Sequence, residues 1–316
     1  MSLLQVKNIT KQLPNGLLIK DINFEYETLQ KIAITGESGA GKTTLLKIIS
    51  AHVQPDKGSI FFNGERVIGP DEKLLPGHRE IAYLSQDHEL LHNYKVDELV
   101  WFENKLSFEE ASDLFKVCQI DHLLKRKTDQ LSGGEQQRIV LCLLLMKAPR
   151  LLVLDEPFSN LDLLHKNILR KVLADITERL QITCMLTSHD PYDTLSWADE
   201  IIVMKEGSIV QKGTPEEIYH QPVNEYIAGL FGKYNLLNPS TAALFGIESN
   251  GNSVMTRPEH FVMSTTGNGI NGIIQKISFW GNFYEADVMV KDARIIIRMM
   301  KNNWEPGKKV LVNIRN

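Results

Sequence analysis

Residues 36–43, GESGAGKT, constrain the fold of this chain more than any other stretch. They fit the pattern G-x-x-x-x-G-K-[ST] of a phosphate-binding loop, which requires a strand before it and a helix after it. The apolar run Lys31–Thr35 predicts that strand, and Thr44–Ser50 reads as the helix. This context favours a phosphate-binding loop over a plain glycine-rich turn. The stretch therefore predicts an α/β fold that holds a nucleotide.

Within this loop, glycines let backbone N–H groups approach phosphate oxygens, and the helix N-terminus adds partial positive charge. Lys42 is expected to reach the outer phosphates, and Thr43 to offer its hydroxyl to a magnesium ion. The residues expected to contact the nucleotide here are Gly36, Glu37, Ser38, Gly39, Ala40, Gly41, Lys42, Thr43 and Thr44.

A second site candidate follows the continuous apolar run Leu151–Leu154, which predicts a buried parallel strand. Two acids, Asp155 and Glu156, come at its carboxyl end, where ligands of open α/β sheets bind. Adjacent acids on a surface usually have no special role, but this position favours a functional one. Asp155 suits a magnesium partner, and Glu156 suits a general base, a role commonly worth about 10²–10⁴ in rate.

A third motif is Leu131–Arg138, with the sequence LSGGEQQR. Alone, it could be a turn before a helix. Together with residues 36–43, it makes the chain resemble the nucleotide-binding subunit of an ATP-binding cassette (ABC) transporter. The resemblance implies that Ser132, Gly133 and Gly134, at a helix N-terminus, close over ATP held by a second copy of the chain.

The same resemblance implies roles for three more residues. Gln86 follows a predicted strand, Ile81–Ser85, and would contact magnesium and the attacking water. Asp162 would lie along the dimer interface, although it also suits an N-cap for the predicted helix Leu163–Leu180. His189 would be the switch histidine at the terminal phosphate, where an imidazole can donate a hydrogen bond.

The residue expected to face the adenine departs from the family pattern. ABC proteins usually carry an aromatic residue near the first turn, and the matching position here is Leu13. Base–aromatic stacking contributes about 1–3 kcal/mol. We therefore expect weaker ATP binding or looser base preference, but not loss of binding.

Residues 93–130 read as a helical segment, and Ser107–Glu110 fits a capping box. Apolar residues then follow at helical spacing, which core packing alone explains. The resemblance adds that this helical subdomain carries the surface on which a membrane permease docks.

After about residue 232 the pattern changes. Residues 235–252 read as a linker with one short helix, and short strand candidates separated by Gly, Asn and Pro then predict a small OB-like β-barrel. Arg257–Glu259, Gly281 and Gly307–Val310 resemble the TOBE domain of importer ATPases. The basic tail also holds four clustered aromatics, Phe279, Trp280, Phe283 and Tyr284, which suit either the barrel's core or an oligonucleotide platform.

We therefore expect an α/β P-loop NTPase of the ABC class with a helical subdomain, residues 1–232, followed by a linker and TOBE-like all-β domain, residues 233–316. A net charge of −4 argues against general nucleic-acid or membrane-surface binding. The longest apolar run, Ile139–Met146, is too short to span a bilayer. The start lacks a signal-peptide profile. The protein is expected to be cytoplasmic and peripheral on the membrane.

The predicted function is hydrolysis of ATP, with magnesium, to power a permease that imports a solute of the sugar, polyamine, iron or oxyanion class. The expected partners are a second copy, the permease and, through the permease, an external solute-binding protein; no direct nucleic-acid partner is expected. The alternative is a soluble ABC ATPase acting on ribosomes or nucleic acid, although such relatives usually carry two cassettes. The solute itself is not readable from the residues.

Overall fold

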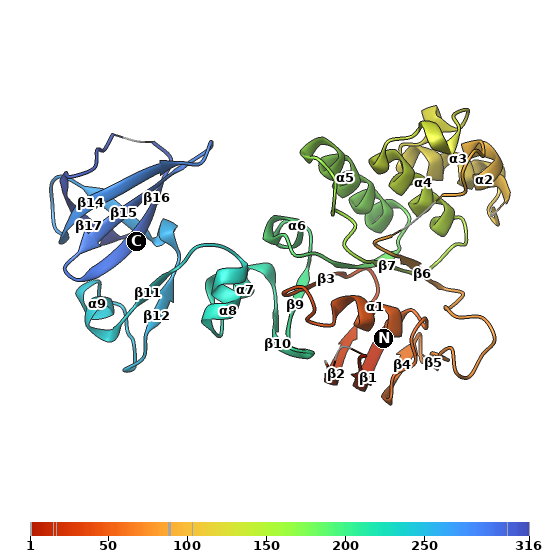
Figure 1. Ribbon diagram of the computed structural model, residues 1–316, viewed down its shortest axis with the longest axis horizontal. Coiled ribbons are helices and arrows are strands. Elements are labelled where there is room, and N and C mark those ends of the chain that lie inside the picture. Colours follow the sequence, from red (N-terminus) through yellow and green to blue (C-terminus); the bar gives the residue numbers. More distant parts are fainter. Residues whose placement is uncertain are drawn as a thin grey trace. The chain divides into compact units, whose positions relative to one another are not determined.

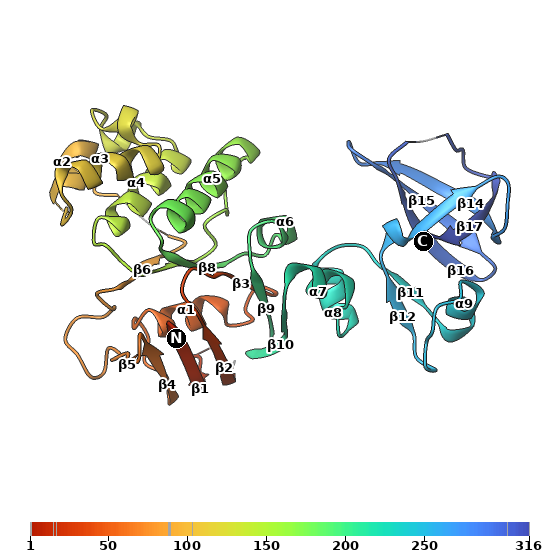
Figure 2. The same ribbon diagram turned by 180° about the vertical axis from the view of Figure 1, so that it is seen from behind.

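The computed structural model describes residues 2–14, 16, 18–87, 90–102, 104–301 and 303–315. The chain folds as two compact units, residues 1–215 and 216–316 (Figures 1 and 2). The helices α7 (Pro215–His220) and α8 (Glu225–Leu230) are grouped with the second unit. The domain boundary expected after residue 232 stays a prediction.

A six-stranded sheet forms the centre of the first unit. All of its strands except β10 run parallel, so their carboxyl ends lie at one edge. In spatial order the strands are β10 (Ser208–Gly213), β9 (Glu200–Lys205), β3 (Lys31–Thr35), β8 (Thr183–Thr187), β7 (Leu151–Leu154) and β6 (Ile81–Leu84). This is the α/β sheet that the apolar runs predicted, and it brings the residues after β6, β7 and β8 together.

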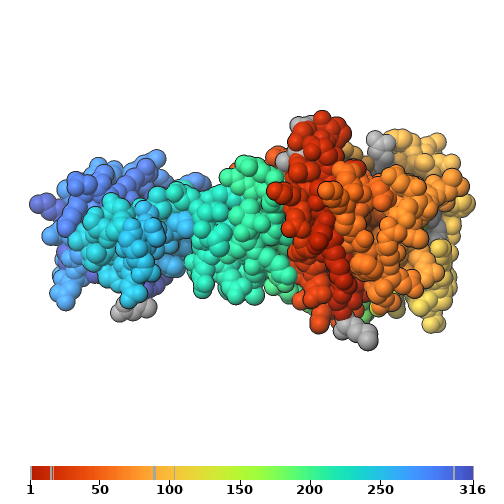
Figure 3. Space-filling model, turned by 90° about the horizontal axis from the view of Figure 1, so that it is seen from below, coloured from red at the N-terminus to blue at the C-terminus, as the bar shows by residue number. Residues whose placement is uncertain are grey.

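A second, antiparallel sheet lies on one side of the first. Its strands, in spatial order, are β2 (Leu18–Tyr26), β1 (Leu4–Gln12), β4 (Lys57–Phe62) and β5 (Glu65–Arg66). Helix α1 (Lys42–Ile49) lies between the two sheets and buries Leu45 and Ile49 in their shared apolar core. In the space-filling view of Figure 3 this N-terminal part, red to orange, covers one face of the first unit.

The other face of the six-stranded sheet is covered by α5 (Leu163–Arg179), as both ribbon views show. Beside it the helical subdomain gathers α2 (Val96–Phe102), α3 (Phe108–Val117), α4 (Gly133–Leu145) and the short 3-10 helices Asp121–Leu123 and Thr128–Gln130. The predicted capping box of α3 is present: Ser107 Oγ accepts from the Glu110 N–H, and the Glu110 carboxylate accepts from the Ser107 N–H. A short helix, α6 (Pro191–Leu195), follows β8.

The second unit is built on an antiparallel five-stranded sheet, as the all-β prediction for the tail requires. Its order is β13 (Phe261–Ser264), β17 (Lys309–Ile314), β14 (Ile270–Phe279), β15 (Tyr284–Val290) and β16 (Ala293–Met299). The edge strands β13 and β16 also lie close together, so the sheet curves around its apolar core. The unit further contains a ladder of β11 (Asn235–Leu237) and β12 (Val254–Thr256), helix α9 (Pro239–Leu244), and the 3-10 helix Pro258–His260.

Some element boundaries differ from the sequence predictions. Strand β1 continues to Gln12, because its pairing with β2 resumes after two irregularities. Helix α1 begins at Lys42 rather than Thr44. Helix α8 follows α7 and is capped by Asn224, whose side chain accepts from the Ile227 N–H.

Candidate active site

The loop between β3 and α1 has a backbone that requires glycine. Gly36 has φ 147°, and a Cβ there would lie 2.2 Å from the Met204 carbonyl oxygen. Gly41, with φ 98°, is the N-cap residue of α1. These conformations bring the loop close to β9 and turn the first N–H groups of α1 toward one cavity.

Lys42, at the first turn of α1, is 6% exposed. Its Nζ donates to the carbonyl oxygens of Gly36 at 2.7 Å and Glu37 at 3.0 Å. Burial lowers the pKa of Lys42, and the negative charges of Glu156 and Asp155 act in the opposite direction. The lysine is thus a cation held inside the loop, and anionic neighbours help to keep it charged.

Asp155, directly after β7, is 2% exposed and accepts hydrogen bonds from three hydroxyls. Thr43 Oγ1 lies 3.0 Å and Thr187 Oγ1 2.8 Å from Asp155 Oδ1. Tyr83 Oη lies 3.1 Å from Asp155 Oδ2. Burial, and then the nearby Asp155 charge, raise the pKa of Tyr83, so its hydroxyl stays protonated and can donate. The carboxylate is therefore oriented through both of its oxygens.

Glu156 has an unusual backbone for a residue with a side chain, with φ 47°. Its N–H donates to Thr187 Oγ1 at 2.8 Å. Its carboxylate lies against His189, whose Nδ1 is 2.8 Å from Glu156 Oε2. Positive φ in a non-glycine residue is uncommon and concentrates at functional sites.

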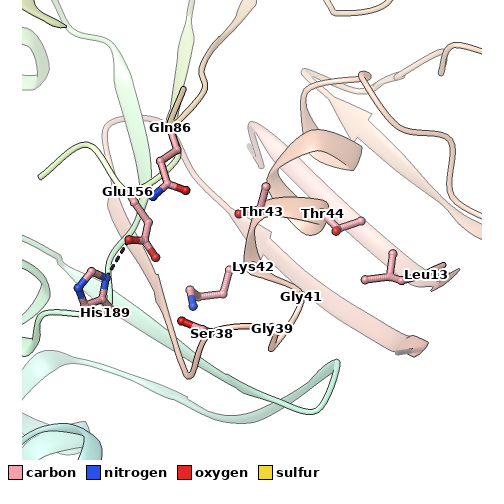
Figure 4. A pocket seen from close by; sticks show the side chains of 10 residues that line it. All are labelled: Leu13, Ser38, Gly39, Gly41, Lys42, Thr43, Thr44, Gln86, Glu156 and His189. Atoms are coloured by element: carbon pink, nitrogen blue, oxygen red, sulfur yellow. Dashed lines mark hydrogen bonds and ion pairs between the residues drawn. The ribbon is translucent and has the colours of Figure 1, made fainter. Parts of the chain in front are cut away.

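The phosphate loop, Glu156 and His189 border one cavity of about 530 Å³ (Figure 4). Leu13 lies at one end, and Glu156 and His189 lie at the other. The described residues of its wall are Leu13, Ser38, Gly39, Gly41, Lys42, Thr43, Thr44, Gln86, Glu156 and His189. The structure thus brings together most of the phosphate loop, the three residues predicted to be catalytic and the position predicted to face the base.

The remaining predicted site residues lie outside this wall. Gly36, Glu37 and Ala40 belong to the loop but do not line the cavity, and Asp155 reaches it through Thr43. Ser132 is the N-cap of α4: its side chain accepts from the Glu135 N–H, and Gly133 begins the helix. Asp162 is the N-cap of α5, as the alternative interpretation expected.

One histidine connects the α4 N-terminus with the start of α5. His165 Nδ1 lies 2.9 Å from the Asp162 carboxylate. A Cβ added to Gly134 would lie 2.6 Å from His165 Cδ2, so the two helices approach closely at this point. Ser132, Gly133, Gly134 and Asp162 therefore form a second cluster within one chain.

The donor set at the loop fits a magnesium ion by its chemistry. Thr43 offers a hydroxyl oxygen, Asp155 a carboxylate beside it, and Gln86 an amide on the same cavity wall. Hard divalent cations prefer such oxygen donors. Because Thr43 gives its proton to Asp155, the other side of its oxygen is left to face a cation.

Sequence reasoning missed three polar residues that support this site. Thr187 and Tyr83 both orient Asp155. Asp193 is 1% exposed and accepts hydrogen bonds from Lys166 and Arg170 of α5 and from the Ser188 hydroxyl. It therefore connects α5 to the residue just before His189. Residues 182–187 have a pattern that predicts a strand ending at Thr187, and this was the one available signal; nothing in the sequence distinguished Tyr83 or Asp193.

Comparison with known proteins agrees with this geometry. Residues 19–159 match the family described as ABC transporter. Over 98% of its length, the chain is 30% identical to the sulfate/thiosulfate import ATP-binding protein CysA of Synechocystis sp., of which it covers 93%. It is 31% identical to the Fe(3+) ions import ATP-binding protein FbpC 1 of Rhodococcus jostii, covering 98% of this chain and 96% of that one.

Among solved structures, cbiO1 from Clostridium perfringens, described as part of the ABC transporter complex cbiONQ, superposes with a TM-score of 0.61 at 26% identity. The match covers 69% of this chain and 90% of that one.

The fold and the cavity define a P-loop ATPase, and the full-length similarities place it more narrowly. The chain belongs to the ABC transporter family, as an ATP-binding subunit of the importer type whose hydrolysis of ATP drives transport. The alternative of a soluble ATPase acting on ribosomes or nucleic acid finds no support in these similarities. None of the helices in the described part of the chain combines the length and apolar character needed to cross a membrane.

Proposed function

We propose that ATP binds in the cavity of Figure 4 with its phosphates on the β3–α1 loop and its base toward Leu13. One observation carries this proposal: the cavity joins the Lys42 loop to Glu156 and His189 within a single wall. Lys42 and the first N–H groups of α1 would hold the outer phosphates, since both supply positive charge there. The adenine would contact an aliphatic side chain instead of an aromatic ring.

Thr43 and Asp155 would hold a magnesium ion, with Gln86 beside it. When bound, the ion would offset the negative charge of the phosphates. Glu156 would accept the proton of the attacking water or polarise it. With both ring nitrogens protonated, His189 would donate through Nδ1 to the Glu156 carboxylate, at 2.8 Å, and through Nε2 to the terminal phosphate. In phosphoryl transfer such positioning and electrostatic stabilisation supply most of the catalysis.

A second copy of the chain would complete each site. Ser132, Gly133 and Gly134 lie outside the cavity wall of their own chain, and they stand at a helix N-terminus, which favours anions. Asp162, tied to the same helix through His165, would lie at the contact between the copies. Closing and reopening of this dimer would drive a permease, which would hold the protein on the inner face of the membrane and take solute from an external solute-binding protein.

The solute stays open. The two relatives named above carry names for chemically different solutes, sulfate or thiosulfate and Fe(3+). We propose only that the solute belongs to the sugar, polyamine, iron or oxyanion class, since in this arrangement the permease and the external receptor would select it.

Two variants test the proposal with purified protein. Glu156→Gln is expected to bind ATP, hydrolyse it about 10²–10⁴ times more slowly and form a dimer with ATP on a sizing column. Lys42→Ala is expected to lose ATP binding. Near-normal turnover in the first variant, or unchanged affinity in the second, would refute the assigned roles. Recovery of a polytopic permease from host membranes with Glu156→Gln and ATP would support the partner, whereas recovery of ribosomes or nucleic acid would contradict it.

A further inference from the structure

A tyrosine outside the nucleotide cavity controls one oxygen of the buried carboxylate at its edge. Tyr83 Oη lies 3.1 Å from Asp155 Oδ2, whereas Thr43 and Thr187 both donate to Oδ1. Among the described residues, Tyr83 is the hydrogen-bond donor to Oδ2. The tyrosine is in β6, three residues before Gln86, and does not line the cavity.

This arrangement fixes a torsion that is otherwise soft. The carboxylate of an aspartate turns about a bond between sp³ and sp² carbons, which has broad minima. Donors at one oxygen alone leave that rotation partly free. Tyr83 at Oδ2, opposite the two threonines at Oδ1, restrains it. The restraint reaches Thr43, because the direction of its hydroxyl proton follows the position of Oδ1.

Tyr83 lines a second cavity, of about 630 Å³. The described wall of this cavity shares no residue with the described wall of the nucleotide cavity. There the ring packs against His52 with 5.2 Å between ring centroids. Tyr83, Asp155 and Thr43 thus form a continuous row of side chains from one cavity wall to the other.

We propose that Tyr83 is a positioning residue for the magnesium–nucleotide site, acting on Thr43 through Asp155, and that its packing on His52 helps to set that position. The inference rests on the proposed function, since it assigns magnesium to Thr43 and Asp155. It predicts a specific loss: magnesium affinity falls, whereas the affinity for ATP without magnesium does not.

The test is the magnesium dependence of ATP binding, measured at equilibrium with a fluorescent ATP analogue on the full-length protein. In Tyr83→Phe the magnesium concentration for half-maximal binding is expected to rise about tenfold. Removing a group that hydrogen-bonds to a metal ligand commonly lowers metal affinity by about 10- to 100-fold, and we expect the lower value. Binding in EDTA is expected to stay unchanged, because Lys42 and the loop hold the phosphates.

Tyr26→Phe is the matched control. Tyr26 is a buried tyrosine of the first unit, and its hydroxyl lies 3.3 Å from a carboxylate oxygen of Glu200, a residue outside the cavity wall. The Tyr26→Phe variant is expected to lose a comparable hydroxyl contact, while the magnesium concentration for half-maximal ATP binding stays as in wild type. His52→Ala, which removes the packing partner but keeps the Tyr83 hydroxyl, is expected to shift the magnesium midpoint in the same direction and by less.

Three results would overturn the inference: a magnesium midpoint in Tyr83→Phe within twofold of wild type, an equal loss with magnesium and with EDTA, or the same shift in Tyr26→Phe. An unchanged midpoint in His52→Ala would remove the role of the packing contact. Failure of the wild-type protein to bind ATP would instead refute the proposed function, so the two failures are distinguishable.

Discussion

The side chains of Glu156 and His189 meet at one end of the nucleotide cavity, with 2.8 Å between Glu156 Oε2 and His189 Nδ1 (Figure 4). The two residues follow different strands, β7 and β8, which are neighbours in the parallel sheet. The glutamate side chain is 17% exposed and the histidine side chain 63% exposed. The histidine therefore presents its outer edge to solvent while it holds the more buried carboxylate.

From this contact we predict that His189→Ala binds ATP but hydrolyses it about 10²–10³ times more slowly, the usual loss when one preorganised donor is removed from a reacting centre. The measurement is ATP turnover alongside equilibrium ATP binding. His122→Ala is the control, because His122 is an exposed residue of the helical subdomain. Turnover within a few-fold of wild type would contradict a role of His189 in the reaction.

Two adjacent glycines of the LSGGE motif are predicted to respond differently to a methyl group. A Cβ at Gly134 would lie 2.6 Å from His165 Cδ2, whereas a Cβ at Gly133 meets nothing within 4 Å. Gly134→Ala is therefore expected to lower the free energy of unfolding by about 1–3 kcal/mol, the usual cost of overpacking. Gly133→Ala is expected to leave it unchanged.

Urea unfolding of both variants without nucleotide tests this difference. The same proteins then report on the proposed dimer: Gly133→Ala, although stable, is expected to lose ATP-dependent association on a sizing column in the Glu156→Gln background. Equal stability of the two variants would show that His165 moves aside at little cost.

Sequence reasoning named the described residues of the cavity wall, but not the residues that orient the side chains beside it. Four parallel strands are each followed closely by candidate site residues, and the carboxyl ends of these strands lie at one edge of the sheet. These residues are 36–43, Gln86, Asp155, Glu156 and His189. Tyr83 could not be assigned in this way. In the four-residue strand β6 three residues are buried and Tyr83 is half-buried, so no polar–apolar alternation shows which way the tyrosine points.

The contacts of Arg257 in the second unit were also beyond sequence reasoning. This side chain is 2% exposed and donates to the backbone carbonyls of Tyr219 and Ala228, 38 and 29 residues earlier. It also lies over the Tyr219 ring, with 4.2 Å between the guanidinium carbon and the ring centroid. Arg257, which directly follows β12, thus joins α7 and α8 to the rest of the second unit, and residues so far apart in the sequence give no local pattern that would predict these contacts.

We therefore predict that Arg257→Ala lowers the stability of the second unit by about 3 kcal/mol, because it leaves several buried carbonyls without their donor. ATP binding by the first unit is expected to be unchanged. Arg294→Ala is the control: its side chain is 63% exposed and pairs with Asp287, and such surface pairs contribute about 0–1 kcal/mol. Thermal unfolding followed by calorimetry, together with ATP binding, distinguishes the two. Loss of both properties in Arg257→Ala would contradict the expected independence.

The stability of the first unit is predicted to fall in mild acid through His52. Burial lowers the pKa of this imidazole, so the folded protein binds fewer protons than the unfolded chain as pH falls below about 6.5, the ordinary histidine value. The free energy of unfolding should therefore decrease between pH 7 and 5.

His52→Phe tests this, because it keeps an aromatic ring against Tyr83 and removes the titrating group. In urea unfolding at several pH values, its free energy of unfolding should decline less steeply with falling pH than that of wild type. A decline as steep as that of wild type would assign the effect to other groups, such as His78, whose pKa burial also lowers.

The last prediction concerns the base end of the cavity, where Leu13 forms part of the wall. An aromatic ring at this position would add stacking on a nucleotide base, about 1–3 kcal/mol. Leu13→Tyr is therefore expected to bind ATP roughly 5- to 150-fold more tightly and to discriminate more strongly between ATP and GTP. Leu74→Tyr is the control, because Leu74 is 96% exposed and lies outside this wall. If both variants bind ATP and GTP as the wild-type protein does, the base does not lie against residue 13. If the wild-type protein already binds ATP much more tightly than GTP, other groups in the cavity distinguish the two bases, and the aliphatic side chain of Leu13 does not weaken adenine selectivity.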